Sequence, residues 1–568
     1  MPGGGAPFDR FVKFPELTEI LQRWAAEHPN LFRLSSIGKS YEDRDIWLCT
    51  VTNHETADAA ERPAIWIDAN IHATELTGST AALYLVHKLL AEYGSDETVT
   101  RAVDTRTFYV VPRMGPDGAE LAMAEKPRWV RSSVRDYPRT DQQDGLIAQD
   151  MDGDGRILTM RIKDRNGTWK PCPADHRLLV PRDPIEEGPG PYYRLLTEGE
   201  IQNYDGITVK AAPNIAGLDM NRNYPVEWRP ENEQVGAGPY PTSEPEIRAV
   251  VQAIVDRPNI CAFIQYHTMA GAHLRPYGTK ADDALPVFDL RVFKQIGEKA
   301  TELTGYPAVS VFHDFKYHPK EVITGVADDW VYEHLGIHGW TTEFWNARKA
   351  AGIEDADKKF IEWGLGHSVD DDLKLLAWSD EELNGEGFVE WYAYDHPQLG
   401  PVELGGWNTA FCFRNPPLHL LEAEVAPHAD WAIWHVLISP LLRLRDQEVV
   451  RFDAETWGVR VVVENTGWLP TNVTAKALER KVVRPVEAEI TLPEDVELLG
   501  APGDRKRELG QLAGRALRNN MTLFGGGHDA TSDRAKAEWI VKGPEGAVLP
   551  VVVSHQRAGT VRTEITLG

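Results

Sequence analysis

The chain has very few cysteines for its length. Only four of its 568 residues are cysteine, and they stand far apart, at Cys49, Cys172, Cys261 and Cys412. No CxxC pair occurs, which excludes a cysteine zinc site and a dithiol redox centre. So few cysteines in so long a chain favour reduced core residues over a disulfide framework.

Long apolar runs and an excess of positive charge are also missing. No stretch approaches the ~18 apolar residues of a membrane span, and the N-terminus lacks the basic and apolar segments of a leader. The 60 Lys and Arg residues face 86 Asp and Glu residues, which gives a formal net charge of −26. Phosphate backbones and anionic membranes would repel such a chain. We therefore expect no nucleic-acid or membrane partner, and a cytoplasmic location unless a leader has been removed.

The length suggests two to four domains, and the first part of the chain alternates between strand-like and helix-like segments. Apolar runs typical of strands lie at 45–51, 64–67, 108–111, 261–266 and 339–344. Helical spacing of apolar residues occurs at 8–36, 79–90, 244–255, 290–303 and 418–445. This alternation predicts an α/β domain with a mostly parallel sheet.

A long segment interrupts this pattern. Residues from about 132 to 217 are rich in Pro, Gly and Asp and show little periodicity. A structureless loop of this length would be unusual, so we expect the insertion to have structure or a function of its own. Because it lies between two candidate site residues, Arg131 and Asn221, we hypothesise that it covers the cleft and restricts it to small substrates.

The last part of the chain has a different character. Short β-rich runs separated by turn residues lie at 459–464, 471–478, 487–492, 537–541 and 549–555. Such spacing predicts a separate β-sandwich over residues 449–568. No catalytic set of residues occurs in it, so we expect a packing or interaction module.

Polar side chains of catalytic type follow three of the apolar strands. The run at 64–67 leads into His72 and Glu75, which are spaced so that they can converge on one point. The run at 261–266 ends at His267. Glu343 lies inside the aromatic run at 339–344, where burial of a lone carboxylate is costly and needs an explanation. Open α/β sheets bind their ligands at the carboxyl ends of such strands.

Together these residues predict a zinc enzyme. Two histidines and a glutamate, His72, Glu75 and His267, are the ligand set of catalytic zinc sites. Zinc can lower the pKa of a bound water to about 7. A separate carboxylate must then take the water's proton and pass it to the leaving amine, and Glu343 fits that role.

These residues, taken in the order in which they occur along the chain, resemble the motifs of the zinc metallocarboxypeptidases of the carboxypeptidase A-like family. Matching stretches run from about residue 8 to 445, with the insertion as the main departure. Pro116-Asp117-Gly118, the segment 238–244 and Asp329-Trp330 occur in the family's order. The resemblance implies an α/β/α sandwich with a mixed, mostly parallel sheet in a catalytic domain at 1–448, followed by the all-β sandwich domain.

The resemblance also implies a role for each candidate. The two histidines and the glutamate would hold one zinc ion per chain, and Glu343 would be the general base and acid. Asn221 and Arg222 would hold the terminal carboxylate of a peptide, because a planar cation beside an amide suits such a ligand. Arg131 would polarise the scissile carbonyl group, with Arg128 as the alternative.

Two positions depart from the family pattern. Thr74 stands before Glu75, where pancreatic-type members place an arginine that assists binding. The mobile active-site tyrosine also fails to align, because counting back from Trp330 without gaps gives Glu321. Tyr317, four residues earlier, can take the place of this tyrosine only if the loop follows a different path from that of the family. We therefore expect looser clamping of the substrate.

Asp328 falls at the floor of the family's specificity pocket, where members that prefer C-terminal Lys or Arg place an acid. A buried acid would favour a basic side chain by Coulomb attraction. The alternative is that Asp328 caps a turn or lies outside the pocket.

The insertion contains one further motif, a DxDxDG sequence. Asp150, Asp152 and Asp154 offer oxygen ligands at alternating positions, as in calcium loops. The glutamate usual at the twelfth position is missing, since Arg161 stands there. A calcium site would need another acid from elsewhere, and a solvated acidic turn is the alternative.

From these residues we expect a zinc-dependent carboxypeptidase acting on peptides with a free C-terminal carboxylate, with a possible preference for basic C-terminal residues. The same chemistry would also serve an amidase acting on isopeptides, cell-wall peptides or N-acyl amino acids. A non-catalytic peptide-binding module is a third alternative. An inactive relative would most easily lose Glu343 or a zinc ligand, and all four residues are present.

Overall fold

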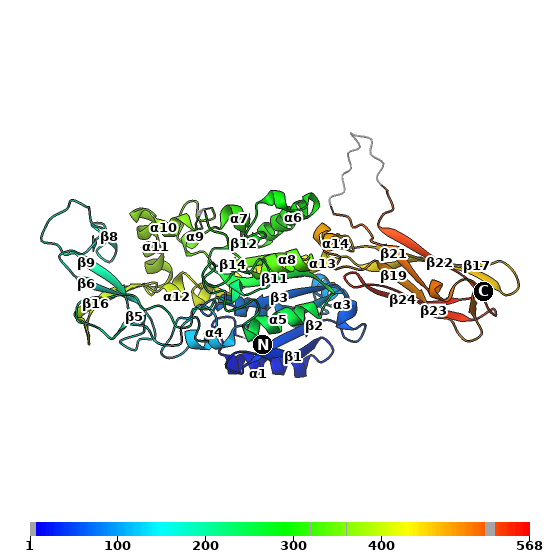
Figure 1. Ribbon diagram of the computed structural model, residues 1–568, viewed down its shortest axis with the longest axis horizontal. Helices are drawn as coiled ribbons and strands as arrows, with labels where there is room; N and C mark the ends of the chain where they lie inside the picture. Colours follow the sequence, from blue (N-terminus) through cyan, green and yellow to red (C-terminus); the bar gives the residue numbers. More distant parts are fainter. Residues whose placement is uncertain (1–6, 319, 359, 517–528) are drawn as a thin grey trace, which may run out of the picture.

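A mixed eight-stranded sheet forms the centre of the molecule (Figure 1). The computed structural model describes residues 7–568 except 319, 359 and 517–528. The strand order is β1-β2-β4-β3-β11-β14-β12-β13, in which β4, β3, β11 and β14 run parallel. The strands are β1 (Phe32–Lys39), β2 (Asp45–Val51), β3 (Ala64–Ala69), β4 (Thr107–Val111), β11 (Ile260–Thr268), β12 (Ala272–Arg275), β13 (Ala308–Ser310) and β14 (His338–Phe344).

Helices cover both faces of this sheet, which confirms the predicted α/β/α sandwich. Every residue of β3, β4, β11 and β14 is buried, as continuous apolar strands between two helical layers require. Neighbouring residues of β3 join opposite cores: Ile65 and Ile67 lie in one and Trp66 in the other. The first core contains α1 (Phe14–Glu27), α2 (Thr77–Ala91), α3 (Glu97–Thr105), α6 (Val287–Thr304) and α13 (Leu421–Leu437), and the second α5 (Pro245–Val255) and α8 (Ala327–Leu335).

Two helices are shorter than the sequence predicts. The expected helix at 8–36 ends at Glu27, and β1 follows it. Pro29 explains this end, because a residue that precedes proline is disfavoured in the helical conformation. The expected helix at 418–445 ends at Leu437, shortly before Pro440, and its last residues belong to a strand of the following region.

The insertion has structure of its own. β6, β7, β8 and β9 lie inside it, and they pair with a hairpin from much later in the chain in a six-stranded sheet ordered β15-β16-β6-β9-β7-β8. The two strands of that hairpin were not predicted. The bounds are β5 (Gly145–Ala148), β6 (Thr159–Lys163), β7 (Trp169–Pro171), β8 (Leu179–Pro181), β9 (Tyr193–Thr197), β10 (Gly199–Gln202), β15 (Phe388–His396) and β16 (Gly400–Trp407). β5 and β10 form a separate antiparallel pair.

Short helices complete the region around this second sheet. Figure 1 places α10, α11 and α12 beside it, at the left end of the molecule. Their bounds are α10 (Glu362–Leu365), α11 (Val369–Glu382) and α12 (Thr409–Cys412), and three further short helices elsewhere are α4 (Pro116–Ala122), α7 (Val311–Asp314) and α9 (Ala347–Ala350).

The C-terminal region consists of two four-stranded antiparallel sheets around one apolar core. Their orders are β17-β18-β22-β20 and β21-β19-β23-β24. The strands are β17 (Leu442–Arg451), β18 (Thr456–Asn465), β19 (Val486–Ile490), β20 (Glu497–Leu498), β21 (Lys506–Gly510), β22 (Arg534–Lys542), β23 (Val548–His555) and β24 (Gly559–Thr566). The boundary expected at residue 449 falls inside β17.

One predicted strand of this region is wrong. Residues 471–478 contain the short helix α14 (Ala475–Glu479) instead of a strand. The Thr474 side chain accepts a hydrogen bond from the backbone N–H of Ala477, and such an N-cap favours a helix start over an extended strand.

This helix joins the two regions. Asp289 of α6 accepts hydrogen bonds from the backbone N–H groups of Ala475 at 2.7 Å and Lys476 at 3.0 Å. The Thr474 hydroxyl donates to the carbonyl oxygen of Gly336 at 2.8 Å. Gly336 ends α8 with a φ of 60°, and a Cβ atom there would lie 2.5 Å from Ala477. Only glycine permits this close approach.

All four cysteines are free and buried, as expected of reduced core residues. Among the described residues, no helix has the length and apolar character needed to cross a membrane.

We expect Asp289→Ala to lower the free energy of unfolding by about 2–3 kcal/mol, because two buried N–H groups of α14 would lose their acceptor. Thermal or urea unfolding measures the change. Asp283→Ala, at an exposed position six residues earlier, is the matched control and should unfold like the wild type. Equal stability of the two variants would contradict the role given to Asp289.

Candidate active site

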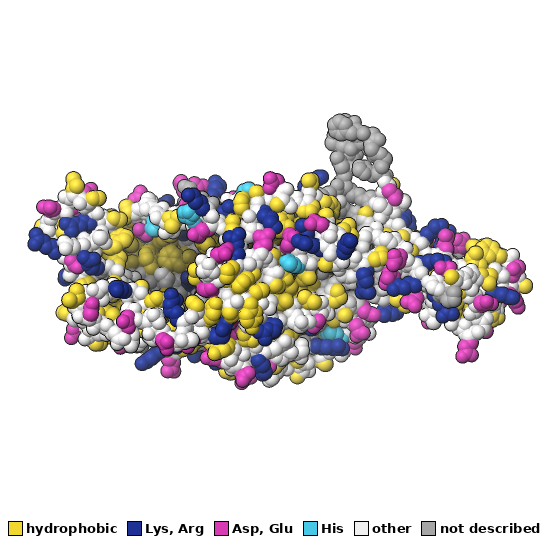
Figure 2. All heavy atoms as spheres, in the orientation of Figure 1, with side chains coloured by type: hydrophobic (Ala, Val, Ile, Leu, Met, Phe, Trp, Pro, Cys, Tyr) yellow, Lys and Arg dark blue, Asp and Glu magenta, His cyan; other side chains and the backbone are white. Residues whose placement is uncertain are grey.

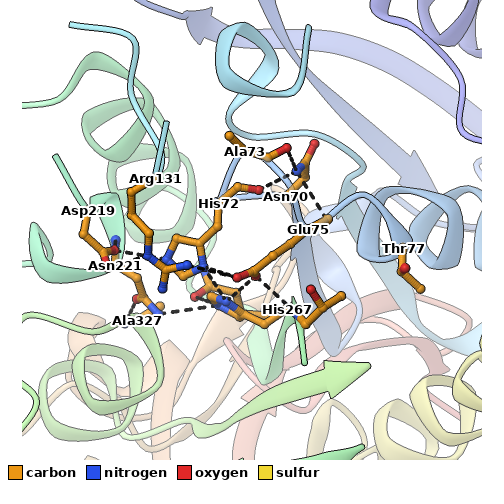
Figure 3. Close-up of polar contacts among 12 residues, drawn as sticks. Asn70, His72, Ala73, Glu75, Thr77, Arg131, Asp219, Asn221, His267 and Ala327 are labelled. Atoms are coloured by element: carbon orange, nitrogen blue, oxygen red, sulfur yellow. Dashed lines mark hydrogen bonds and ion pairs between the residues drawn. The ribbon is translucent and has the colours of Figure 1, made fainter. Parts of the chain in front are cut away.

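Three metal-ligand side chains meet at the carboxyl ends of β3 and β11 (Figure 3). The chain leaves β3 through Asn70, which has a φ of 60° and whose side-chain amide donates to the carbonyl oxygen of His72 at 2.7 Å. This turn places His72 and Glu75 in the loop before α2. His267 comes from the penultimate position of β11. All three side chains are buried.

Their ligand atoms lie within contact of one another. His72 Nδ1 is 2.9 Å from Glu75 Oε1, and His267 Nδ1 is 3.1 Å from Glu75 Oε2. The two Nδ1 atoms are 3.1 Å apart. Burial works to raise the pKa of Glu75, but the two histidines outweigh it and hold that pKa well below its usual range.

The second ring nitrogen of each histidine, Nε2, faces a hydrogen-bond acceptor. His72 Nε2 lies 3.0 Å from Oδ1 of Asp219, and His267 Nε2 lies 2.8 Å from Oε1 of Gln265. The orientation of the Gln265 amide follows from its other end, where Nε2 donates to Asp68 at 2.8 Å. The proton of each ring is therefore on Nε2, as carboxylate and carbonyl partners of metal-binding histidines require.

This arrangement tests whether the residues fit a zinc ion. With protons on both Nε2 atoms, the two Nδ1 lone pairs and the Glu75 carboxylate face the same buried point. Three electron-pair donors at such distances repel one another unless a cation lies between them. Nitrogen and carboxylate ligands in a two-to-one ratio suit zinc. His72, Glu75 and His267 therefore fit the expected ion.

Glu343 lies directly beside this ligand set. β14 and β11 are parallel neighbours, and Glu343 pairs in register with His267. Burial raises the pKa of Glu343 to about 7, with Glu75 adding to the effect and His267 opposing it. Within the described part of the chain, its Oε2 atom is buried and has no hydrogen-bond partner. Such a carboxyl can hold or release a proton near neutral pH.

A small cavity of about 50 Å³ joins Glu343 to the predicted carboxylate-binding pair. Asn221 and Arg222 line it, as do the two histidine ligands. Asn221 Oδ1 accepts from the backbone N–H of Ala327 at 3.1 Å, and Arg222 donates to the carbonyl oxygen of Asn221 at 2.7 Å. These bonds anchor both side chains at the cavity wall.

Arg131, and not the alternative Arg128, reaches the site. Its guanidinium donates to Asp219 Oδ2 at 3.0 Å and to Glu75 Oε1 at 3.1 Å, and it lines the same cavity (Figure 3). Arg128 is exposed and is not among the cavity residues.

Two further candidates line the cavity. Asp328 sits in the first turn of α8 and is buried, and burial raises its pKa to about 6 while a hydrogen bond with Thr341 opposes the shift. Tyr317 lies at the mouth of the cavity with 48% of its surface exposed. Glu321, the ungapped alternative, is exposed and does not line it.

The predicted calcium loop is only partly assembled. Asp150 and Asp152 approach Glu198, the kind of distant acid that the motif lacks. Asp154 instead forms an ion pair with Arg156 at 2.8 Å. Asp150 and Glu198 each accept hydrogen bonds from two backbone N–H groups of the surrounding loop. The carboxylates thus stabilise the loop itself, and a calcium ion is not supported.

Sequence reasoning missed the residues that orient the ligands. Gln265 and Asp68 are polar residues inside fully buried strands, and Gln265 stands two positions before His267, on the same face of β11. Those two signals were available in the sequence. No such signal in the sequence pointed to Asn415. Its side chain accepts hydrogen bonds from the N–H groups of Leu76 and Thr77 at the start of α2, about 340 positions away.

The fold and site define an α/β/α protein with a buried centre of two histidines and one carboxylate. The family model described as zinc carboxypeptidase matches residues 17–157 and 193–361, together more than half of the chain. The chain therefore belongs to the zinc carboxypeptidase family. The match omits 158–192, in the middle of the insertion. A model of a domain of unknown function matches residues 441–566.

Individual relatives are distant. A zinc carboxypeptidase of Saccharothrix mutabilis subsp. capreolus is 33% identical over 20% of this chain and 26% of its own length. Carboxypeptidase A2 of Rattus norvegicus is 22% identical over 59% of this chain and 62% of its own length. The chain thus spans less than two thirds of either relative.

Solved structures are also only distantly similar to this chain. Thrombin-activatable fibrinolysis inhibitor superposes with a TM-score of 0.39 at 18% identity, over 65% of this chain and 74% of that chain. The carboxypeptidase A of Helicoverpa armigera has the same TM-score at 16% identity, over 66% and 75%. The family assignment depends on the sequence match and not on these superpositions.

We expect Gln265→Leu to weaken zinc binding about 10–100-fold, because the His267 ring would lose the acceptor that orients it. Competition with a chromophoric chelator measures the dissociation constant. Gln252→Leu, on the exposed face of α5, is the matched control and should bind zinc like the wild type. Unchanged affinity in Gln265→Leu would contradict the assigned protonation of His267.

Proposed function

We propose that the protein is a zinc-dependent carboxypeptidase that removes the last residue of a peptide. One observation carries the proposal: the carboxylate-binding pair, the general base candidate and the two histidine ligands line one cavity. The cavity is small, about 50 Å³, and the Arg222 cation at its wall is buried. A buried cation in the cavity wall suits the free carboxylate of a chain end, and a continuing chain would offer it no negative charge.

Each residue then has a defined task. Arg222 and Asn221 bind the terminal carboxylate, which places the last peptide bond beside the ligand set. The two histidines and Glu75 would hold the zinc ion, which would supply a Lewis acid for the attacking water and for the carbonyl group. Arg131 donates hydrogen bonds toward the oxygen that gains negative charge. Glu343 takes the proton of the attacking water and delivers it to the leaving amine.

A preference for basic C-terminal residues is a finer part of the proposal. Its support is the position of Asp328, a buried acid in the lining of the cavity that would receive the terminal side chain. Arg222 lines the same cavity, so the positive charge beside the carboxylate opposes a second cation. The balance between these two groups sets the preference.

The alternatives keep part of this chemistry. An amidase acting on isopeptides, cell-wall peptides or N-acyl amino acids would use the same residues, provided that its substrate has a free carboxylate near the cut bond. A non-catalytic peptide-binding module would leave Glu343 without a task. The expected cytoplasmic location and the absence of nucleic-acid partners stay predictions.

We expect Glu343→Gln to lower kcat about 10²–10⁴-fold while zinc content stays at one ion per chain, because proton transfer is lost and the ligands remain. A panel of blocked dipeptides and metal analysis give the two readouts. Glu354→Gln, at an exposed position, is the control. Hydrolysis at the wild-type rate by Glu343→Gln would show that the assigned mechanism is wrong.

We expect Asp328→Asn to reduce the ratio of kcat/KM for C-terminal Lys or Arg over Leu by about tenfold or more, because the attraction of a buried carboxylate is removed. Release of each residue from the same blocked peptide measures the ratio. If the ratio does not change, Asp328 does not select the side chain, and the carboxypeptidase proposal is unaffected.

A further inference from the structure

A wide cleft lies next to the candidate active site. Its volume is about 590 Å³, and Figure 2 shows a hollow with a hydrophobic inner wall on the left of the molecule, where Figure 1 places α11, α12 and β6. Seven aromatic side chains line this insertion cleft: Trp129, Trp169, Trp363, Phe388, Trp391, Trp407 and Phe413. Leu178, Leu179, Leu195 and Met269 add aliphatic surface.

The cleft adjoins the site through three points of the chain. Met269 follows the zinc ligand His267 by two residues, and Trp129 precedes Arg131 by two. Arg414, at the cleft wall, lies within electrostatic reach of Glu343. A substrate whose last residue occupies the small cavity can therefore continue into the cleft.

Arg414 is held at this junction by its neighbour. The Asn415 side chain accepts from the N–H groups of Leu76 and Thr77 and donates to the carbonyl oxygen of Thr74 at 2.9 Å. This ties the Arg414 segment to the loop that carries Glu75. Among the described residues, the Arg414 guanidinium makes no hydrogen bond or ion pair with another side chain, so its donors are available to a substrate carbonyl group.

The aromatic walls are rigid. The Trp391 indole donates to the carbonyl oxygen of Arg177 at 2.7 Å, and the Arg161 guanidinium lies over the Trp391 ring at 4.3 Å. Trp363 stacks on His367 with ring centres 3.8 Å apart. An apolar surface that is already ordered loses little side-chain entropy when a ligand binds.

Three charged or titratable groups of the cleft, Arg177, His367 and Asp372, are already paired. Arg177 forms ion pairs with Asp175 and Asp380, and His367 pairs with Asp372 at 3.0 Å. Sugar rings need hydrogen-bonding partners at their edges, and these three side chains already have partners of their own. Aromatic rings and aliphatic chains instead gain from burial against such surfaces.

We propose that the insertion cleft binds apolar, aromatic side chains of the peptide on the N-terminal side of the scissile bond. The enzyme then selects its substrates by the residue before the cut as well as by the last residue. This inference rests on the proposed carboxypeptidase function, since the direction of the substrate is set by Arg222 and Asn221. The insertion accordingly recruits apolar peptides instead of only restricting the size of the substrate.

The test compares acetyl-Gly-Phe-X with acetyl-Gly-Gly-X, where X is the C-terminal residue that the wild type releases fastest. We expect kcat/KM to be at least tenfold higher with Phe. Trp169→Ala and Trp363→Ala remove rings contributed by the insertion and by α10, and each should reduce this ratio to about 3 or less, with the Gly substrate cleaved within twofold of the wild-type rate. Trp47→Ala, at a half-buried position of β2 outside the cleft, should keep the full ratio.

Two other substrates test other occupants of the cleft. N-lauroyl-Gly-X carries a fatty acyl chain, and an N-acetylmuramyl peptide ending in X carries a sugar. If either is cleaved tenfold faster than the Phe peptide, the inference is overturned in favour of that occupant. A wild-type ratio near 1, or a ratio unchanged in both tryptophan variants, also overturns it.

A binding measurement separates this inference from the proposed function. Glu343→Gln retains the cleft, and tryptophan fluorescence reports binding of the two acetyl peptides to it. If the Phe peptide binds more tightly but the wild type does not hydrolyse it, the proposed carboxypeptidase activity is contradicted. The proposed binding of aromatic side chains in the insertion cleft then still stands. If both peptides bind with equal affinity and are hydrolysed at equal rates, only the proposed role of the insertion cleft is contradicted.

Discussion

The convergence of three buried lone pairs at the ends of β3 and β11 is the constraint on which the site depends. His72, Glu75 and His267 face one another at 2.9–3.1 Å, and this is tolerable only with a cation between them. Other residues fix the orientation of the two imidazole rings, because Asp219 and Gln265 accept hydrogen bonds from their Nε2 atoms. The parallel register of β11 and β14 then places Glu343 beside His267. The three ligand residues and Glu343 thus belong to one part of the sheet and the loop that follows it.

The fold around this centre forms two adjoining spaces. The small cavity contains the charged groups that suit a chain end, and the insertion cleft offers aromatic surface beside it. The cleft exists because residues 159–197 pair with 388–407 in one sheet. The acidic loop at Asp150 belongs to the same region, where its carboxylates serve the backbone of the loop.

Much of the candidate site was predictable, for local physical reasons. Apolar runs long enough to be buried on both faces identified the four central strands, and polar residues at their carboxyl ends pointed to His72, His267 and Glu343. The sequence favoured Arg131 over Arg128 but could not decide between them firmly, because both lie in the same irregular segment. Ungapped counting gave Glu321 instead of Tyr317, since only the path of the loop decides which residue reaches the cavity.

What the sequence by itself determined is therefore the type of the central strands and of the main helices, the α/β/α layers and the chemistry at the strand ends, because neighbouring residues show burial and periodicity directly. The tertiary structure alone decided the pairing of the insertion with β15 and β16, the capping of α2 by Asn415 and the helix at 475–479 that docks on Asp289. These contacts join residues far apart in the chain or depend on one capping hydrogen bond. Short, half-exposed strands and single polar contacts leave no local pattern from which their partners can be inferred.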